Sequence, residues 1–156
     1  MAIFLFKKRL HVLLKLRQRR LWNSLILKVL PKLKLLVFDT AKKYFDTADQ
    51  VLGYSLSDVI FNGPAEKLTE TRFCQSAIYT MSCASLAAFR EKFPEAVPVA
   101  AAGLSLGEYA ALFCGKAFSF EEGLKLLQKR ADLMDECCRN TQGGMATALG
   151  CEAAVI

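Results

Sequence analysis

The stretch VPVAAAGLSLGEYAALFCG, residues 97–115, decides the fold that we expect for this chain. Its first six residues are small or branched and apolar, which is typical of a strand buried on both faces of a sheet. Glu108–Cys114 has the pattern of a helix. Between the two lies Gly103-Leu-Ser105-Leu-Gly107, which fits the pattern Gly-x-Ser-x-Gly. The stretch therefore predicts a strand that turns sharply into a helix, with a serine at the turn.

Such a turn has chemical consequences for Ser105. A strand that becomes a helix within one residue strains the residue at the turn, and glycines two positions away relieve the crowding. The serine hydroxyl is then raised above the sheet, and the Leu106 amide faces the same space at a helix N-terminus. An attacking serine and a developing oxyanion need this arrangement. The alternative is a tight structural turn in which the serine is merely small.

The rest of the chain alternates between helix and strand patterns, which favours an α/β fold with a mostly parallel sheet. A helix is expected from residue 38 to 52, where apolar residues recur at helical spacing: Phe38, Ala41, Phe45, Ala48 and Leu52. Another is expected over residues 75–90, where one face carries Ile78, Met81, Ser85 and Phe89. A third helix should begin at Ser119, because Ser119 and Glu122 form a capping box. Its apolar stripe comprises Leu124, Leu127, Ala131, Met134 and Cys138, and residues 145–149 resemble the start of another strand.

Composition narrows the class of protein. The chain has 156 residues, of which 53% are hydrophobic, and no apolar run is long enough for a membrane span. We therefore expect a cytoplasmic protein without stable membrane insertion. Its six cysteines include no Cys-x-x-Cys pair, and the only histidine is His11. We expect reduced thiols and no metal site.

The first part of the chain differs in character from the rest. Residues 1–38 contain ten Lys or Arg and no acid, whereas the remainder has eleven basic and fifteen acidic residues. Residues 7–37 combine basic and large apolar side chains. This segment fits a basic helix on a membrane surface, a transit peptide or an arm that binds RNA. The pattern favours none of these readings, and we expect no nucleic-acid partner.

From residue 38 onward, several motifs resemble one enzyme family in the same order. The segment AAGLSLGEYAAL resembles the nucleophile segment of malonyl-CoA:acyl carrier protein transacylases. Upstream, ADQVLGYSLSDVIFNGPAEKLTETRFCQSAI is similar to the family, and downstream so are FSFEEGLKLLQKRADLMDECC and GGMATALG. The resemblance covers residues 38–156 and implies part of an α/β-hydrolase-like acyltransferase core with a nucleophile elbow.

The resemblance implies an activity and a set of site residues. Ser105 would take the malonyl group from malonyl-CoA as an ester and pass it to the phosphopantetheine thiol of acyl carrier protein, in fatty acid biosynthesis. No other cofactor is implied. Leu106 would donate to the oxyanion, and Arg130 would bind the free carboxylate of malonate, which suits the planar, two-pronged guanidinium. Gln75 and Leu104 would line the substrate site.

The chain also departs from the family. Leu104 stands where the family often has histidine. Residues 1–6 look family-like, but the expected Pro-Gly-Gln-Gly turn is replaced by Lys7-Lys8-Arg9-Leu10. The family's general-base histidine comes from a region past residue 156. We therefore expect residues 38–156 to be the N-terminal portion of an acyltransferase domain, truncated before that histidine and weakly active or inactive.

These departures leave several alternatives open. A disrupted reading frame over residues 7–37 would explain the break in resemblance. The chain could instead be a serine hydrolase or thioesterase, for which a carboxylate anchor such as Arg130 is not expected. It could also be a non-catalytic basic protein that binds a membrane or nucleic acid through its first segment. The sequence leaves open the acyl-chain preference beyond malonyl and the oligomeric state.

Overall fold

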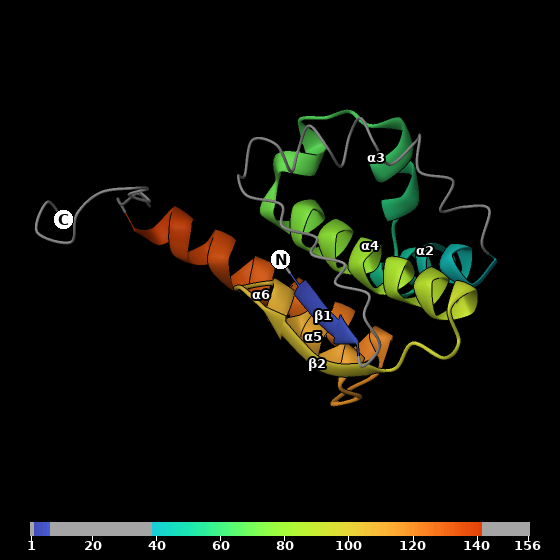
Figure 1. Cartoon of the computed structure of the whole chain (residues 1–156). Coiled ribbons are helices and arrows are strands. Elements are labelled where there is room, and N and C mark those ends of the chain that lie inside the picture. Colours follow the sequence, from blue (N-terminus) through green and yellow to red (C-terminus); the bar gives the residue numbers. More distant parts are fainter. Residues whose placement is uncertain (1, 7–38, 142–156) are drawn as a thin grey trace, which may run out of the picture.

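The computed structural model describes residues 2–6, as backbone, and residues 39–141 (Figure 1). The strand pattern expected at residues 145–149 and the basic segment 7–37 lie outside the described residues. In chain order, the elements are β1 (Ala2–Phe6), α2 (Asp39–Leu52), α3 (Leu56–Asn62), the short 3₁₀ helix η2 (Lys67–Thr69), α4 (Thr71–Lys92), β2 (Pro98–Gly103), α5 (Gly107–Cys114) and α6 (Phe120–Asn140).

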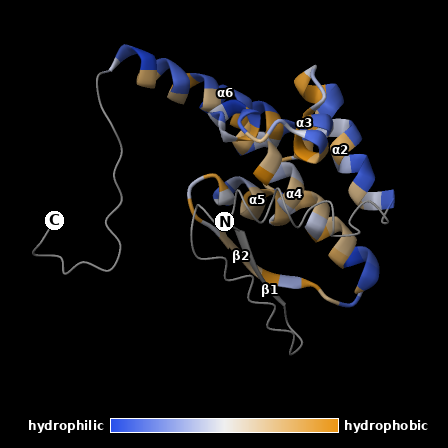
Figure 2. Cartoon of the chain, turned by 90° about the horizontal axis from the view of Figure 1, so that it is seen from above, coloured by the Kyte–Doolittle hydropathy of each residue, from blue (hydrophilic) through white to orange (hydrophobic). Residues whose placement is uncertain are grey.

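Helix α4 is the centre of the described structure. It contacts α2, α3, α5, α6 and η2, and α5 also packs against β1 and β2. In Figure 1 the strand pair lies beside α5, and the C-terminal end of α6 projects away from the other helices. In Figure 2, α4 and α5 are coloured mainly as apolar, whereas polar and apolar residues alternate along α6.

The helices expected from the sequence are present, and two of them bury the expected residues. Helix α2 buries Ala41, Phe45, Ala48 and Leu52, which recur at helical spacing. Helix α6 buries Leu124, Leu127 and Ala131, whereas Met134 is half-buried and Cys138 is exposed on the projecting end. The capping box is confirmed, because the Ser119 amide donates to Glu122 Oε2 at 2.7 Å and the Glu122 amide donates to Ser119 Oγ at 3.2 Å.

The face of α4 that carries its large apolar residues is not its most buried face. Ile78, Met81 and Phe89 are only half-buried. The buried positions are mainly small side chains together with Tyr79, and they include Ala77, Thr80, Cys83, Ala84 and Ala88. Because α4 is packed against neighbours on several sides, small residues allow the close approach of the helices.

The strand pair corrects two expectations. Strands β1 and β2 pair antiparallel, from Ala2 opposite Gly103 to Leu5 opposite Ala100, where the sequence predicts a mostly parallel sheet. Alternation of strands and helices predicts parallel pairing only for strands joined by one crossover, and three α-helices separate these two strands. Burial of β2 on both faces is also wrong for the described part of the chain, because Val99 is 58% exposed.

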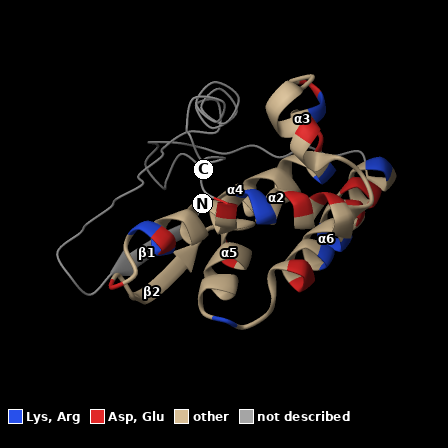
Figure 3. Ribbon diagram, turned by 90° about the vertical axis from the view of Figure 1, so that its right-hand side faces the viewer, with Lys and Arg blue, Asp and Glu red and all other residues tan. Residues whose placement is uncertain are grey.

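Charge is unevenly distributed over the described residues. Strand β2, with the sequence PVAAAG, has no charged residue, and charged side chains are concentrated on the helices (Figure 3). None of the helices in the described ranges is long and apolar enough to cross a membrane.

Candidate active site

The turn between β2 and α5 places Ser105 in a strained conformation. Its φ is 54°, in the left-handed region that non-glycine residues seldom adopt. The strand ends at Gly103 and the helix begins at Gly107, so only three residues make the turn. Ser105 is exposed, and its hydroxyl is therefore not lost in packing.

The first glycine of the motif is explained by its close contact with the backbone of Gly107 and Glu108. A Cβ added to Gly103 would lie 2.0 Å from the carbonyl carbon of Gly107 and 2.3 Å from the amide nitrogen of Glu108. Only glycine at position 103 allows the end of β2 to touch the first turn of α5. The strand, the turn and the helix thus lie where Gly-x-Ser-x-Gly predicts them.

The first turn of α5 leaves one amide available beside Ser105. The amide of Gly107 donates to the Leu104 carbonyl at 3.0 Å, and the amide of Glu108 donates to the Ser105 carbonyl at 3.0 Å. The Leu106 amide donates to no residue in the described part of the chain. At the N-terminus of a helix, such an amide favours negative charge nearby. Leu104, which precedes the serine, is 78% exposed at the turn.

Arg130 lies against Ser105, although 25 residues separate them. Arg130 Nη2 donates to Ser105 Oγ at 2.9 Å. Its other terminal nitrogen, Nη1, donates to Gln75 Oε1. Three residues that the sequence assigns to one site, on α4, on α6 and at the β2–α5 turn, are therefore in direct contact.

Gln75 is the buried member of this group, at 5% exposed. Its amide is held from both sides, because Oε1 accepts from Arg130 and Nε2 donates to Met134 Sδ at 3.3 Å. From the sequence, Met134 is expected only in the apolar stripe of α6, and its contact with Gln75 is not predicted. Its position four residues after Arg130, on the same face of the helix, is the signal that would have found it.

The arrangement has the chemistry of a site for an anionic acyl group. A guanidinium beside an exposed hydroxyl can bind a carboxylate through parallel N–H donors. The unpaired Leu106 amide can donate to a second oxygen. The described residues contain no cluster of three or more His, Cys, Asp or Glu that could hold a metal ion.

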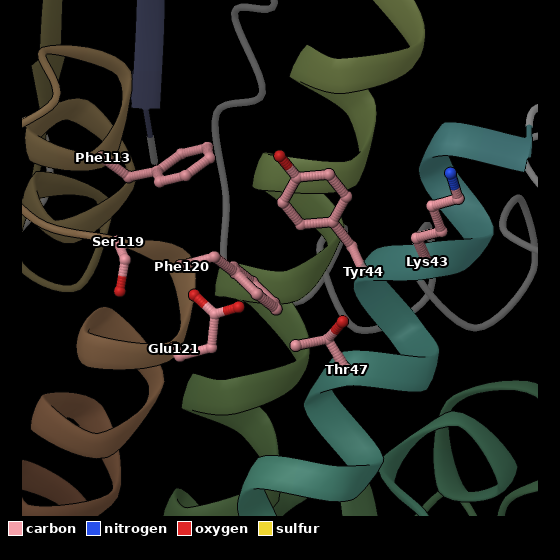
Figure 4. Close-up of a pocket in the computed structure, with 7 residues that line it drawn as sticks. All are labelled: Lys43, Tyr44, Thr47, Phe113, Ser119, Phe120 and Glu121. Carbon is pink, nitrogen blue, oxygen red and sulfur yellow. The ribbon is translucent and has the colours of Figure 1, made fainter.

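A pocket of about 360 Å³ lies elsewhere on the described surface, among α2, α5 and α6 (Figure 4). Its walls include the rings of Tyr44, Phe113 and Phe120. The rings of Tyr44 and Phe120 pack edge to face, with 4.8 Å between their centroids. Neither Ser105 nor Arg130 lines it. The contacts of Ser105, and not this cavity, therefore define the candidate site.

Comparison with known proteins identifies relatives of this arrangement. Residues 35–154 match the family described as the acyl transferase domain. The chain is 42% identical over 117 residues to a probable mitochondrial malonyl-CoA-acyl carrier protein transacylase of Drosophila melanogaster, covering 74% of this chain and 31% of that protein. It is 44% identical over 115 residues to malonyl CoA-acyl carrier protein transacylase of Bacillus subtilis, covering 72% of this chain and 35% of that protein.

A solved structure is similar as well. The acyl carrier protein S-malonyltransferase of Vibrio cholerae superposes with a TM-score of 0.62 at 32% identity, covering 72% of this chain and 35% of that one. The chain thus spans about a third of the length of these relatives.

Proposed function

The chain belongs to the acyl transferase domain family, and from this premise we propose that it accepts a malonyl group from malonyl-CoA on Ser105 and transfers it to acyl carrier protein. The observation that carries the proposal is the 2.9 Å hydrogen bond from Arg130 to Ser105 Oγ. The bond brings together a guanidinium, a group that can bind a carboxylate, and a strained, exposed serine. Residues 38–156 would then be the N-terminal portion of the acyltransferase domain, and the β2–α5 turn its nucleophile elbow.

Each site residue has one role in the proposed reaction. Ser105 Oγ attacks the thioester carbon, a tetrahedral oxyanion forms beside the Leu106 amide, and collapse of that intermediate expels coenzyme A as its thiol. The pantetheine thiol then attacks the serine ester, and the serine hydroxyl is restored. Arg130 binds the malonyl carboxylate, Gln75 holds Arg130 in place, and Leu104 borders the acyl group.

The proposed reaction also requires a proton transfer. Attack by Ser105 needs a group that accepts its proton, and the family takes this group from a histidine outside the motifs matched here. The chain's only histidine, His11, matches no motif of the family and lies outside the described residues. Because loss of the base of a catalytic triad typically costs several orders of magnitude in rate, we expect slow acylation of Ser105. The family resemblance implies that this transfer serves fatty acid biosynthesis, and we include that role in the proposal.

The test is detection of the serine ester. The purified chain is mixed with malonyl-CoA, and intact-mass spectrometry followed by peptide mapping locates any adduct. We expect slow gain of one malonyl group at Ser105, none in Ser105→Ala, and release of the group by acyl carrier protein that bears its pantetheine arm. Malonylation that persists in Ser105→Ala would contradict the proposal, as would the absence of any adduct at Ser105.

A further inference from the structure

Arg130 is already hydrogen-bonded at both of its terminal nitrogens. Nη1 donates to Gln75 Oε1, and Nη2 donates to Ser105 Oγ at 2.9 Å. One N–H donor of the group that is to bind the substrate carboxylate, on Nη2, is therefore engaged by the nucleophile. We propose that the Ser105–Arg130 hydrogen bond restrains the nucleophile before substrate binds, and that the carboxylate of the acyl substrate displaces it. This inference rests on the proposed function of Arg130.

A carboxylate can displace the hydroxyl because it is the stronger acceptor. Hydrogen bonds between a guanidinium and an ionised carboxylate are shorter and roughly twice as strong as neutral ones, and they often form in parallel pairs. A serine hydroxyl offers Nη2 a single neutral acceptor. An acetyl group offers no charged acceptor, so it leaves the Ser105–Arg130 bond in place. Since a ligand shifts an equilibrium only by its difference in affinity for the two states, release of Ser105 depends on the carboxylate.

The contacts of Arg130 indicate which side chain moves. Gln75 is 5% exposed and is itself held by Met134 Sδ, so the guanidinium has a fixed support at Nη1. Ser105 is exposed, and no other hydrogen bond of its hydroxyl is found among the described residues. The serine side chain therefore rotates away while Arg130 stays.

Displacement couples specificity to reactivity. While Oγ accepts from Arg130, one of its two lone pairs is engaged and the hydroxyl is held against a cation, which makes it a weaker nucleophile toward the thioester carbon. When the carboxylate takes Nη2, that lone pair becomes available. A dicarboxylic acyl group would thus free its own nucleophile, and a neutral acyl group that entered the site would meet a restrained one.

Competition between Ser105 and the substrate for Arg130 can be measured as a change in binding affinity. Because coupling between two interactions is reciprocal, a carboxylate that weakens the Ser105–Arg130 bond must itself be bound more weakly while that bond exists. Removing the hydroxyl should tighten the binding of a carboxylate. The probes are malonyl-CoA and acetyl-CoA analogues in which a methylene replaces the thioester sulfur, so that no acyl transfer occurs. Calorimetric titration of the full chain is compared with Ser105→Ala and with Ser105→Gly, the second because glycine adopts a φ of 54° without strain.

We expect both variants to bind the malonyl analogue about two- to tenfold more tightly than the wild type, the range of one net hydrogen bond. Binding of the acetyl analogue should not change. Equal or weaker binding of the malonyl analogue in both variants would overturn the inference. In an Arg130→Ala background, which has no donor for either group, the gain from Ser105→Ala should vanish, and a gain that persists would also overturn the inference, because the hydroxyl would then act by crowding.

The same titrations separate this inference from the function on which it rests. If the wild type binds the malonyl analogue no better than the acetyl analogue, the carboxylate-binding role of Arg130 is wrong, and both proposals fail. If it prefers the malonyl analogue but Ser105→Ala and Ser105→Gly bring no gain, only the displacement fails.

Discussion

The contact between Gly103 and Gly107 predicts that Gly103→Ala strongly destabilises the β2–α5 turn. The added Cβ would lie 2.0 Å from the carbonyl carbon and 2.1 Å from the carbonyl oxygen of Gly107. Carbon atoms in contact prefer a separation of about 3.5–4.0 Å, so strand and helix would have to part by roughly 1.5 Å. Because the opposing atoms are backbone, no side-chain rotation relieves the overlap. We expect a loss of about 3 kcal/mol or more in the free energy of unfolding, the upper part of the range for overpacking.

Gly115→Ala is the matched control for this substitution. A Cβ there would meet nothing closer than 3.5 Å, and the φ of −76° suits any residue. Its effect should stay within about 0.5 kcal/mol. Both variants are compared with the wild type by urea unfolding followed by far-ultraviolet circular dichroism. Similar losses in the two variants, or a small loss in Gly103→Ala, would refute the close approach of β2 and α5.

Three further predictions concern the helices. Gly123→Ala should destabilise the fold by about 1–3 kcal/mol in thermal or urea unfolding, because the added Cβ would lie 2.1 Å from Tyr79 Oη. Unchanged or higher stability would show that the Tyr79 ring can move aside without cost. The hydrogen bonds of the capping box lower the pKa of Glu122, so the ionised carboxylate stabilises the fold at pH values above its ordinary pKa of 4.5, and this stabilisation is lost as the pH falls through the lowered pKa. The wild type should therefore be more stable than Glu122→Gln at neutral pH but not in strong acid. A stability difference of equal size at both pH values would contradict this prediction. Burial raises the pKa of the Cys83 thiol, whereas Cys137 is exposed. A maleimide should therefore modify Cys137 first and Cys83 only on unfolding, and peptide mapping identifies the labelled residues. Early labelling of Cys83 would be inconsistent with its burial.

Local features could be predicted from the sequence because neighbouring residues determine them. The strand–turn–helix around Ser105 follows from glycines two positions on either side, and the capping box follows from Ser119 and Glu122 alone. The buried stripe of α2 is likewise predicted, because one apolar face packs against one side of the core. Each of these depends on contacts within a few positions along the chain.

Features that depend on distant segments could not be predicted in this way. The alternation of strands and helices does not fix the direction of β1, because three α-helices separate it from β2. The apolar run of β2 predicts burial, but Val99 is exposed because no described segment covers it. The buried positions of α4 are mainly small residues, so the spacing of large apolar side chains such as Ile78 and Phe89 does not indicate which face is buried.

The candidate site was predicted in part. The motif alone points to Ser105 and Leu106, whereas Gln75 and Arg130 come from the family resemblance. No spacing rule would join Ser105 to Arg130 or Arg130 to Gln75, which are 25 and 55 residues apart. The contact of Gln75 with Met134 depends on how α4 and α6 pack, which only the structure shows.

The binding of a carboxylate by Arg130 beside Ser105 is the central claim, and one comparison tests it most directly. The affinities of the non-transferable malonyl-CoA and acetyl-CoA analogues are measured by calorimetry for the wild type and for Arg130→Ala. We expect the wild type to prefer the malonyl analogue, and Arg130→Ala to lose about 10- to 100-fold of that preference, since hydrogen bonds to charged groups contribute about 1.5–3 kcal/mol. An equal preference in both proteins would show that Arg130 does not bind the carboxylate.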